Sequence, residues 1–241
     1  LLMFISDLKG IEYFTSLTYL KCSSNQLTSL DVSKNTELKH LICYSNQLLS
    51  LNGVSSTVTV FNAGSLNPFA TTQSSIRYLS DYYGVDVSKI VAGSLTGESL
   101  LTNLVLTPDS IPGKVTYTYD CGSNKTINCT IEFNVEINET NFPDKNFRNY
   151  ITANYDGNKN GFLESDEVAN LTDFVIVNQE ISNLKGIEYF PALTYINCSG
   201  NNLTELDLSK NTELTKLDCH NNKLTKLDLS KNKKLKTLEC Y

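Results

Sequence analysis

The hydrophobic positions between Leu193 and Tyr241 recur with a fixed period. Aliphatic residues, a cysteine and an asparagine follow the pattern L-x-x-L-x-C-x-x-N-x-L, and successive cysteines are 21 residues apart (219 − 198 = 240 − 219 = 21). A constant period of this length is typical of a solenoid, in which each repeat forms one coil that packs only on its neighbours. The pattern therefore predicts a stack of coils in this part of the chain.

Each predicted coil divides into two similar halves of about ten residues. Ile196 and Cys198 alternate with polar residues in one half, and Leu206 and Leu208 do the same in the next. Such alternation points one side of a short strand inward, which predicts strands on both walls of a thin leucine-rich-repeat solenoid. Asparagines recur where the chain turns, and their side-chain amides can bond the backbone of the adjacent coil; they are Asn201, Asn211, Asn222 and Asn232.

Residues 1–54 form another copy of the pattern. The heptapeptide Leu8–Phe14 is identical to Leu184–Phe190, at an offset of 176 residues (184 − 8 = 176). We therefore expect leucine-rich repeats in residues 1–54 and 171–241. Because both copies are truncated, we expect a piece cut from a longer array, whose uncapped edges associate weakly with one another.

Residues 55–138 do not follow the repeat. Hydrophobic and polar residues alternate at 57–61, 114–119 and 127–137, which is typical of strands, while 70–83 could include a short helix. We interpret this segment as a small all-β linking domain, immunoglobulin-like by analogy. The fold class predicted for the chain is mainly β, with solenoid segments joined by this domain and by a helical cap.

Residues 139–170 carry the signals of that cap. Asp144 follows a proline, and both residue types are favoured where a helix starts. Phe147, Tyr150 and Ile151 come next at i, i+3 and i+4 and give one apolar face. The pattern predicts a helix, with Asp144 in its first turn, that seals the first coil of the solenoid.

The segment Asp156–Glu167 matches the twelve-residue calcium loop of an EF-hand. It has Asp at position 1, Asn at 3 and 5, Gly at 6, an aliphatic residue at 8 and Glu at 12. We expect weak calcium binding, at ~10⁻⁴–10⁻³ M as in extracellular modules; the alternative is a cap of the same shape without metal. The predicted ligands are Asp156, Asn158, Asn160, the carbonyl of Phe162, Glu164 and Glu167.

Composition narrows the function classes. The net charge is −6 and no basic run occurs, so the electrostatic footprint of nucleic-acid binding is absent. No apolar stretch reaches the ~18–20 residues that a membrane span needs, so no membrane insertion is expected. The sequence contains no Walker loop, no G-x-S-x-G and no H-E-x-x-H motif, which argues against an enzyme.

Five of the seven cysteines occupy the inward repeat position. We expect a ladder of small buried thiols there, because a free cysteine behaves as a small hydrophobe. Disulfides are the weaker interpretation, since inward side chains in register point the same way. Cys121 and Cys129 flank a predicted hairpin turn with an offset that also argues against a bridge. The five ladder residues are Cys22, Cys43, Cys198, Cys219 and Cys240.

An EF-hand-like cap followed by L-x-x-L-x-C repeats, beside an immunoglobulin-like segment, resembles the internalin-type leucine-rich-repeat proteins of bacterial cell surfaces. The cap match lies in Asn141–Phe147 and in Asp156–Glu167, and the repeat match lies in residues 5–54 and 171–241. The resemblance implies an extracellular or cell-surface bacterial protein whose concave strand face binds a partner protein. This chain has fewer coils than such a binding arc usually needs.

On each strand, the residues that flank the inward position face the concave side. Both histidines and several tyrosines of the chain fall there, and tyrosine is favoured at interfaces. Two functions remain open: an adhesion module that binds a protein or glycan through this face, with calcium stiffening the cap, and a structural spacer that projects other domains. The predicted partner-binding residues are Tyr19, Lys21, His40, Ile42, Tyr44, Tyr195, Asn197, Lys216, Asp218, His220, Glu239 and Tyr241. A metal site shared by the two histidines is not expected, because they belong to different copies.

Overall fold

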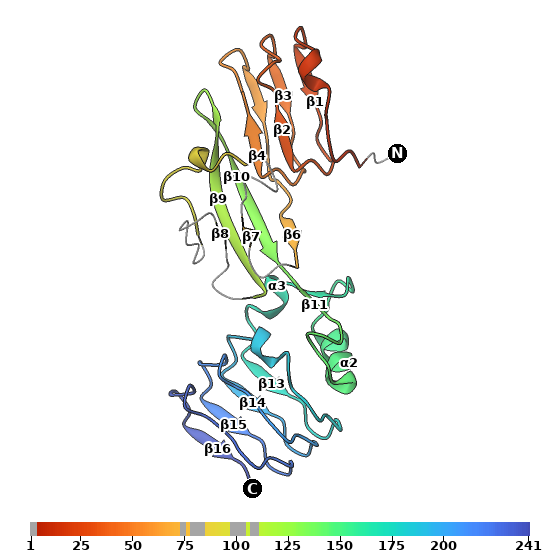
Figure 1. Ribbon diagram of the computed structural model, residues 1–241, viewed down its shortest axis with the longest axis vertical. Helices are drawn as coiled ribbons and strands as arrows, with labels where there is room; N and C mark the ends of the chain where they lie inside the picture. Colours follow the sequence, from red (N-terminus) through yellow and green to blue (C-terminus); the bar gives the residue numbers. More distant parts are fainter. Residues whose placement is uncertain (1–3, 73–75, 78–84, 97–104, 107–110) are drawn as a thin grey trace. The chain divides into compact units, whose positions relative to one another are not determined.

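The computed structural model describes residues 4–72, 76–77, 85–96, 105–106 and 111–241 (Figure 1). It divides into two compact units, each with its own hydrophobic core. The first unit comprises residues 1–109 and 114–133, and the second comprises residues 110–113 and 134–241. The predicted division at residues 54, 138 and 170 is finer than this and stays a prediction.

Stacked coils with strands on both walls form the N-terminal part of the first unit. On one wall, β1 (Tyr19–Lys21), β3 (His40–Ile42) and β5 (Val60–Asn62) pair in parallel. On the other wall, β2 (Ser29–Asp31) pairs in parallel with β4 (Ser50–Asn52). Strands on both walls are thus confirmed for this copy, and the mainly β solenoid fold is confirmed with them.

A β-sheet follows the coils in the first unit. The long strands β9 (Gly113–Gly122) and β10 (Lys125–Phe133) form the hairpin drawn in green in Figure 1, and β6 (Phe69–Thr71) pairs in parallel with β10. Two-residue β7 (Ile76–Arg77) and β8 (Val105–Leu106) pair in antiparallel fashion. The hairpin turn at Ser123 and Asn124 has positive φ at both residues, which suits a two-residue turn.

Two predictions for this segment need comment. The strand expected at 57–61 is placed too early, because β5 begins at Val60 where pairing with β3 begins. In the range 70–83, where a short helix was expected, the described residues belong to β6 and β7, and the remainder lies outside the described residues. The immunoglobulin-like analogy stays a prediction.

The sheet closes the open end of the last coil in the first unit. The Tyr117 hydroxyl donates to the Leu49 carbonyl (2.9 Å), and the Tyr119 hydroxyl donates to Asn52 Oδ1 (2.8 Å). Both tyrosines are buried, so each hydroxyl needs a partner, and the coil supplies it. Coils and sheet therefore share one core.

The second unit begins with the helical cap and continues as a single-sheet solenoid. The cap contains β11 (Val135–Glu136), α2 (Lys145–Asn154), β12 (Phe162–Leu163) and α3 (Ser165–Val168), with β11 antiparallel to β12. The parallel sheet is β13 (Asp173–Val175), β14 (Tyr195–Asn197), β15 (Lys216–Asp218) and β16 (Thr237–Glu239). Figure 1 shows these strands side by side in chain order.

The asparagines bond the backbone of neighbouring coils, as predicted. Asn201 Nδ2 donates to the carbonyls of Ile176 (2.6 Å) and Cys198 (2.9 Å), and Asn222 Nδ2 donates to those of Cys198 and Cys219 (both 3.0 Å). The second row behaves alike through Asn211 and Asn232. These amides satisfy carbonyls at corners that strand pairing does not reach.

The expectation of strands on both walls is wrong for the second copy, where 206–208 and 227–229 form no strand. The first copy has Asp31 opposite Asn52 at the corresponding register position. The second copy has Asp207 and Asp228 there; hydrogen bonds from Ser209 hold the pKa of Asp207 below its usual value, and the nearby Asp228 charge acts against them. Like charges directly opposite disfavour strand pairing, so this juxtaposition is one contribution to the open second wall.

The cysteines are free thiols throughout the described residues, in agreement with the ladder interpretation. Four ladder members are buried, and burial raises the pKa of Cys43 and Cys198 to about 12 and of Cys22 and Cys219 to about 11. Such thiols stay protonated at neutral pH and are poor nucleophiles. The fifth member, Cys240 in the last described coil, is exposed, because no described coil packs over it.

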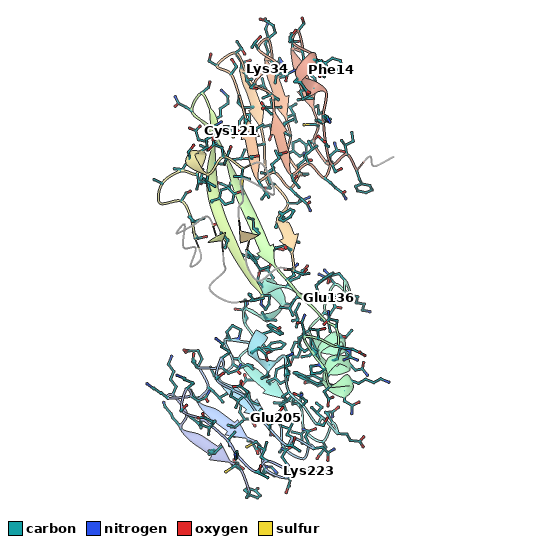
Figure 2. The ribbon with its side chains drawn as sticks, in the orientation of Figure 1. Phe14, Lys34, Cys121, Glu136, Glu205 and Lys223 are labelled. Carbon is teal, nitrogen blue, oxygen red and sulfur yellow. The ribbon has the colours of Figure 1, made fainter. Side chains whose placement is uncertain are left out.

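Among the described residues, no helix is both long and apolar enough to span a bilayer. Figure 2 adds the side chains to the ribbon and labels Phe14, which follows the 3₁₀ turn η1 (Ile11–Tyr13) in the first unit. The equivalent turn in the second unit is η3 (Ile187–Tyr189). The opening coil of each copy therefore contains a single 3₁₀ turn at the same place.

Candidate functional site

The predicted calcium loop, Asp156–Glu167, links α2 to α3. Asp156 is buried, and its carboxylate accepts hydrogen bonds from the backbone N–H groups of Asn160 (3.0 Å) and Gly161 (3.1 Å). Gly161 has a φ of +83°, a left-handed conformation that favours glycine. The sharp turn that the EF-hand spacing predicts is therefore present.

Glu167 closes the loop from its other end. Its two carboxylate oxygens accept from the N–H groups of Gly157 (2.8 Å) and Glu164 (3.1 Å). The Glu164 carboxylate accepts from the side-chain amides of Asn158 (3.0 Å) and Asn160 (2.9 Å). The structure thus brings the five predicted side-chain ligands together in one hydrogen-bonded loop.

The sixth predicted ligand, the carbonyl of Phe162, belongs to β12. Phe162 pairs with Glu136 of β11, and the Ile137 N–H donates to the Gly161 carbonyl (2.9 Å). A short strand from outside the loop thus supports it at its seventh and eighth positions. This pairing fixes the loop backbone independently of any cation.

Asn134 places an orphaned polar atom beside the loop. It is buried, its Nδ2 lies 3.5 Å from Glu164 Oε1, and its Oδ1 has no hydrogen-bond partner. A buried amide oxygen without a partner costs free energy. The donor set is all oxygen, which suits a hard cation, so the residues present fit calcium, although Asn158 and Asn160 would have to turn their amide oxygens toward it.

Asp144 joins the cap to the solenoid. It is the N-cap of α2, where it accepts from the Phe147 N–H (2.9 Å), and not a first-turn residue as predicted. Its other oxygen accepts from the N–H and hydroxyl of Ser182 (both 2.8 Å). Burial alone would raise the pKa of Asp144, but these hydrogen bonds hold it below its usual value.

An aromatic cluster fills the space between cap and opening coil. The Phe174 ring of β13 lies 5.3 Å from the rings of Tyr155 and Phe190 and 6.1 Å from that of Phe147. Phe147, Phe174 and Phe190 are fully buried. Aromatic pairs at these separations contribute about 0.5–1.5 kcal/mol each beyond burial of area, so cap and solenoid form one core.

The outward side chains of β13–β16 form the outer strand face of the second unit. Lys216 Nζ lies 4.7 Å from the centre of the Tyr195 ring, a cation–π contact, and the His220 ring stacks on Tyr241 at 4.8 Å. Asn197 Oδ1 accepts from the Ser199 hydroxyl (2.7 Å). The predicted partner-binding residues of this unit therefore lie on one face, in mutual contact.

The outer strand face of the first unit is smaller. Tyr19 and His40 are neighbours in register, and their rings are 5.7 Å apart. Lys21 pairs with Ile42 in the same ladder, and Tyr44 follows β3. Tyr19 is exposed, while His40, Ile42 and Tyr44 are half-buried.

One possible metal site on the outer strand face of the second unit was not predicted from the sequence. Asp218, His220 and Glu239 each offer a ligand atom within 4.8 Å of the other two; in the described part of the chain they are the one such group of three, and the loop carboxylates do not form another. The 21-residue period carried the signal, because Glu239 lies one period after Asp218 (239 − 218 = 21).

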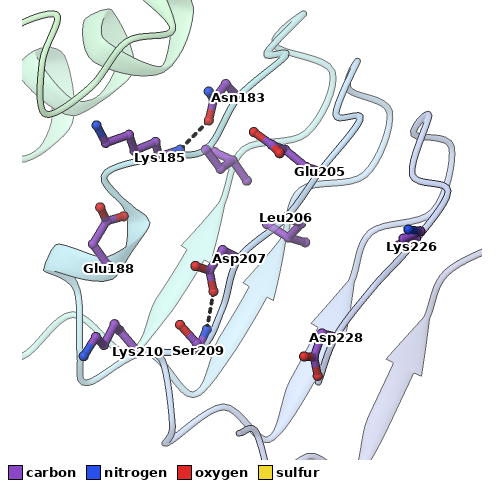
Figure 3. A pocket seen from close by; sticks show the side chains of 11 residues that line it. Asn183, Lys185, Glu188, Glu205, Leu206, Asp207, Ser209, Lys210, Lys226 and Asp228 are labelled. Carbon is purple, nitrogen blue, oxygen red and sulfur yellow. Dashed lines mark hydrogen bonds between the residues drawn. The ribbon is translucent and has the colours of Figure 1, made fainter. Parts of the chain in front are cut away.

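A mixed-charge groove of about 620 Å³ runs along the second wall of this unit (Figure 3). Leu184 and Leu206 form its floor, and lysines alternate with acidic residues at its rim. A smaller groove of about 390 Å³ occupies the equivalent place in the first unit. None of the predicted site residues lines either groove. The charged residues of the larger one are Lys185, Glu188, Glu205, Asp207, Lys210, Lys226 and Asp228.

The parallel strand ladder, the two asparagine rows and the buried cysteines define the protein class as a leucine-rich-repeat solenoid with a helical cap. Sequence comparison adds a likeness to one group within this class: the chain is similar to internalin-type leucine-rich-repeat proteins, and it spans less than a fifth of the length of the relatives it matches. It is 31% identical over 133 residues to Internalin J of Listeria monocytogenes serotype 4b (strain F2365), a match that covers 52% of this chain and 14% of that relative. No family model matches the chain.

Two solved structures are also similar to this chain. A crystal structure of an internalin (inlF) from Listeria monocytogenes has 28% identity and a TM-score of 0.39 and covers 42% of this chain and 30% of its own. The functional domain of InlJ from Listeria monocytogenes, which includes a cysteine ladder, has 23% identity and a TM-score of 0.27 and covers 98% of this chain and 46% of its own. Both TM-scores are below 0.5.

Proposed function

We propose that this chain is a non-enzymatic adhesion module of an extracellular or cell-surface bacterial protein, and that its outer strand faces bind a protein or glycan. One observation carries the proposal: aromatic and charged side chains contact one another on the outer face of a rigid parallel ladder, as Lys216 does over Tyr195. Such side chains dominate binding energy at interfaces.

The second wall differs from the outer strand face in how little its side chains vary between coils. Its turns repeat one local structure, in which an aspartate accepts from the N–H two residues later, at Asp31, Asp207 and Asp228. These side chains satisfy their own backbone, whereas those of the outer strand face vary from coil to coil. Variation on a fixed scaffold is what recognition requires. The similarity to Internalin J supports the same reading, although it covers 14% of that relative.

The competing function is a structural spacer that projects other domains and has no ligand. The two are distinguished by binding of the whole chain to arrays of host glycans and host-cell surface proteins, with calcium and with chelator. We expect binding that Tyr195→Ala with Lys216→Ala abolishes and that Lys185→Ala with Lys226→Ala, in the groove of the second wall, leaves intact. No binding in either calcium condition, or equal loss in both variants, would favour the spacer.

Calcium is the second part of the proposal. We propose that Asp156, Asn158, Asn160, Glu164, Glu167 and the Phe162 carbonyl hold one calcium ion, which stiffens the cap. What supports the proposal is the all-oxygen donor set, together with the buried Asn134, whose Nδ2 lies 3.5 Å from Glu164 Oε1 and whose Oδ1 has no hydrogen-bond partner. A bound ion would offset the charge of the three ligand carboxylates, and this chain's contribution is to hold those oxygens on a backbone paired with β11.

The calcium test compares two variants that remove the same charge. Glu167→Gln keeps an acceptor for the Gly157 N–H but loses a bidentate ligand, while Asp166→Asn changes a neighbouring carboxylate outside the ligand set. We expect calorimetry to give one site at ~10⁻⁴–10⁻³ M, lost in Glu167→Gln and kept in Asp166→Asn. A melting temperature that is insensitive to calcium in the parent chain would leave the loop as a metal-free cap.

Weak self-association is the remaining part of the proposal. Leu238 is 42% and Tyr241 80% exposed at the β16 edge, and unpaired strand edges invite pairing with another chain. Sedimentation over a wide concentration range tests this, with Leu238→Lys expected to give a monomer. A parent chain that stays monomeric at all concentrations would contradict it.

A further inference from the structure

We propose that Asp218, His220 and Glu239 bind a divalent transition-metal cation of the Zn²⁺ class on the outer strand face of the second unit. This site is distinct from the calcium loop of the cap and does not depend on any partner of the face. One ligand atom from each residue lies within 4.8 Å of the other two, so small side-chain adjustments would bring all three to a single ion at the ~2.0–2.2 Å bond lengths of zinc.

Strand register creates the site. Asp218 of β15 is the direct partner of Glu239 of β16, so two carboxylates oppose each other on adjacent strands. Like charges in this arrangement destabilise a sheet, and a cation between them converts the repulsion into attraction. His220 lies just beyond the end of β15, and its ring Nδ1 is 2.5 Å from Asp218 Oδ1.

Of the three residues, Asp218 is the one whose carboxylate a bound cation would stabilise most. It is 7% exposed, and a buried carboxylate is costly without positive charge or several donors. Its carboxylate is contacted by the backbone N–H of His220 (3.4 Å) and by the His220 ring Nδ1 (2.5 Å), and both contacts fall on Oδ1. Oδ2 thus keeps its lone pairs for a further partner.

His220 is held in place before any ion binds. Its ring stacks on Tyr241 with an interplanar angle of 11°, and the contact with Asp218 fixes its rotation. A carboxylate against one ring nitrogen sets the tautomer and makes the other nitrogen a better ligand. The side chain therefore loses little freedom on binding a metal.

The donor set selects the ion. One imidazole with two carboxylates suits zinc and its neighbours in the first transition row, whereas calcium prefers oxygen alone, as in the cap loop. Three protein ligands leave a coordination position open to water. By strand register, the equivalent positions of the first unit are Ile42, Tyr44 and Asn62, so the site belongs to one pair of coils.

The test is a titration of the whole chain with Zn²⁺ alone after treatment with a chelator. A Cys240→Ala background removes the exposed thiol, which could bind zinc by itself. We expect one zinc site, weakened tenfold or more in His220→Gln and in Glu239→Gln, and unchanged in His40→Gln of the first unit. Co²⁺ in place of Zn²⁺ should give a visible spectrum without a sulfur charge-transfer band.

Several outcomes would overturn the site. Zinc binding that disappears in Cys240→Ala belongs to the thiol. Equal zinc affinity in His220→Gln and the parent removes the imidazole from the site. No zinc binding at millimolar concentration leaves His220 and Asp218 as a hydrogen-bonded pair only. Glu167→Gln serves as a further control, because it changes calcium binding by the loop and should leave zinc binding unchanged.

Discussion

The two copies of the heptapeptide Leu-Lys-Gly-Ile-Glu-Tyr-Phe have the same local structure in different surroundings. Gly10 and Gly186 have φ values of +100° and +109°, and each N–H donates to the glutamate two residues later, at 2.8 and 2.6 Å. A 3₁₀ turn follows in both. Yet Phe14 is 62% exposed, while Phe190 is completely buried.

The cap of the second unit accounts for the difference. Phe190 packs against Tyr155 of the cap at 5.6 Å, and the Phe142 ring covers Gly186 so closely that an added Cβ would overlap it. Around Gly10, the same hypothetical atom has no neighbour within 4 Å. Local sequence thus fixes the backbone of the opening coil, and the element packed on it decides whether the same residues are core or surface.

The largest expected effect tests burial directly. Phe190→Ala should destabilise the second unit by about 3–5 kcal/mol, because it removes a buried aromatic ring, while Phe14→Ala should stay within about 0.5 kcal/mol. Urea unfolding followed by peptide-resolved hydrogen exchange reports each unit separately. Equal destabilisation by the two variants would show that Phe14 is buried in solution.

The glycine pair sharpens the comparison. Gly10→Ala and Gly186→Ala both force a side chain into a left-handed conformation, at a cost of about 1–2 kcal/mol. Gly186→Ala must also displace Phe142, which adds about 1–3 kcal/mol of overpacking. The same experiment should therefore rank Gly186→Ala as clearly worse, and equal costs would mean that the cap does not press on this turn.

Asp144 gives the cap a dependence on pH. Asp144→Ala should cost about 1–3 kcal/mol through lost bonds to Phe147 and Ser182, whereas Asp7→Ala, which loses one local bond to Lys9, should cost far less. Because the pKa of Asp144 is lowered on folding, its contribution is complete above the unfolded value of about 3.9 and is lost as pH falls through the lower folded value.

Stability measured from pH 6 to pH 2.5 checks the sign of this effect. The second unit should lose stability in the parent chain as the Asp144 carboxylate becomes protonated. That loss should be smaller in Asp144→Ala, which has no carboxylate to protonate. Parallel pH profiles for the parent and the variant would remove Asp144 as the group responsible.

The smallest expected effect is a change in hydrogen-exchange protection along the second wall of the second unit. Asp228→Asn restores the residue type that the first copy has at Asn52 and relieves the repulsion with Asp207, while the amide oxygen can still accept from the Ser230 N–H. We expect slightly higher exchange protection at 206–208 at low salt, and no difference at high salt, where screening removes the repulsion. Lower protection would show that charge is not what keeps this wall open.

The repeating features of this fold could be predicted from sequence because each coil must satisfy the same backbone carbonyls at its corners. Asn201 and Asn222 bond neighbouring carbonyls in the same way, so a pattern in sequence becomes a pattern in space. The shape of the loop Asp156–Glu167 could also be predicted, since the proposed calcium ligands lie within twelve residues of one another. Spacing alone fixes such local geometry.

Features that depend on distant residues were not readable. The bond from Tyr117 to Leu49 spans 68 residues, and the orphaned oxygen of Asn134 lies beside a side chain 30 residues away. The second wall of the second copy has Asp207 and Asp228 where the first copy has Asp31 and Asn52, a pairing that appears only when the coils are stacked. The 21-residue period could have predicted that Asp218 and Glu239 lie opposite each other. That they form a possible metal site with His220 becomes visible only when the strands are placed in register.

Hydrogen exchange of the two identical heptapeptides tests the central claim, that the cap converts a surface turn into core. Their intrinsic exchange rates are matched, and the amides of Phe14 and Phe190 donate to equivalent carbonyls, those of Ile11 (3.1 Å) and Ile187 (3.2 Å). We predict that Ile187–Phe190 exchanges only with unfolding of the second unit, and that Ile11–Phe14 exchanges through local opening at least a hundredfold faster, a difference of about 2.7 kcal/mol. Equal protection of the two segments would contradict the account.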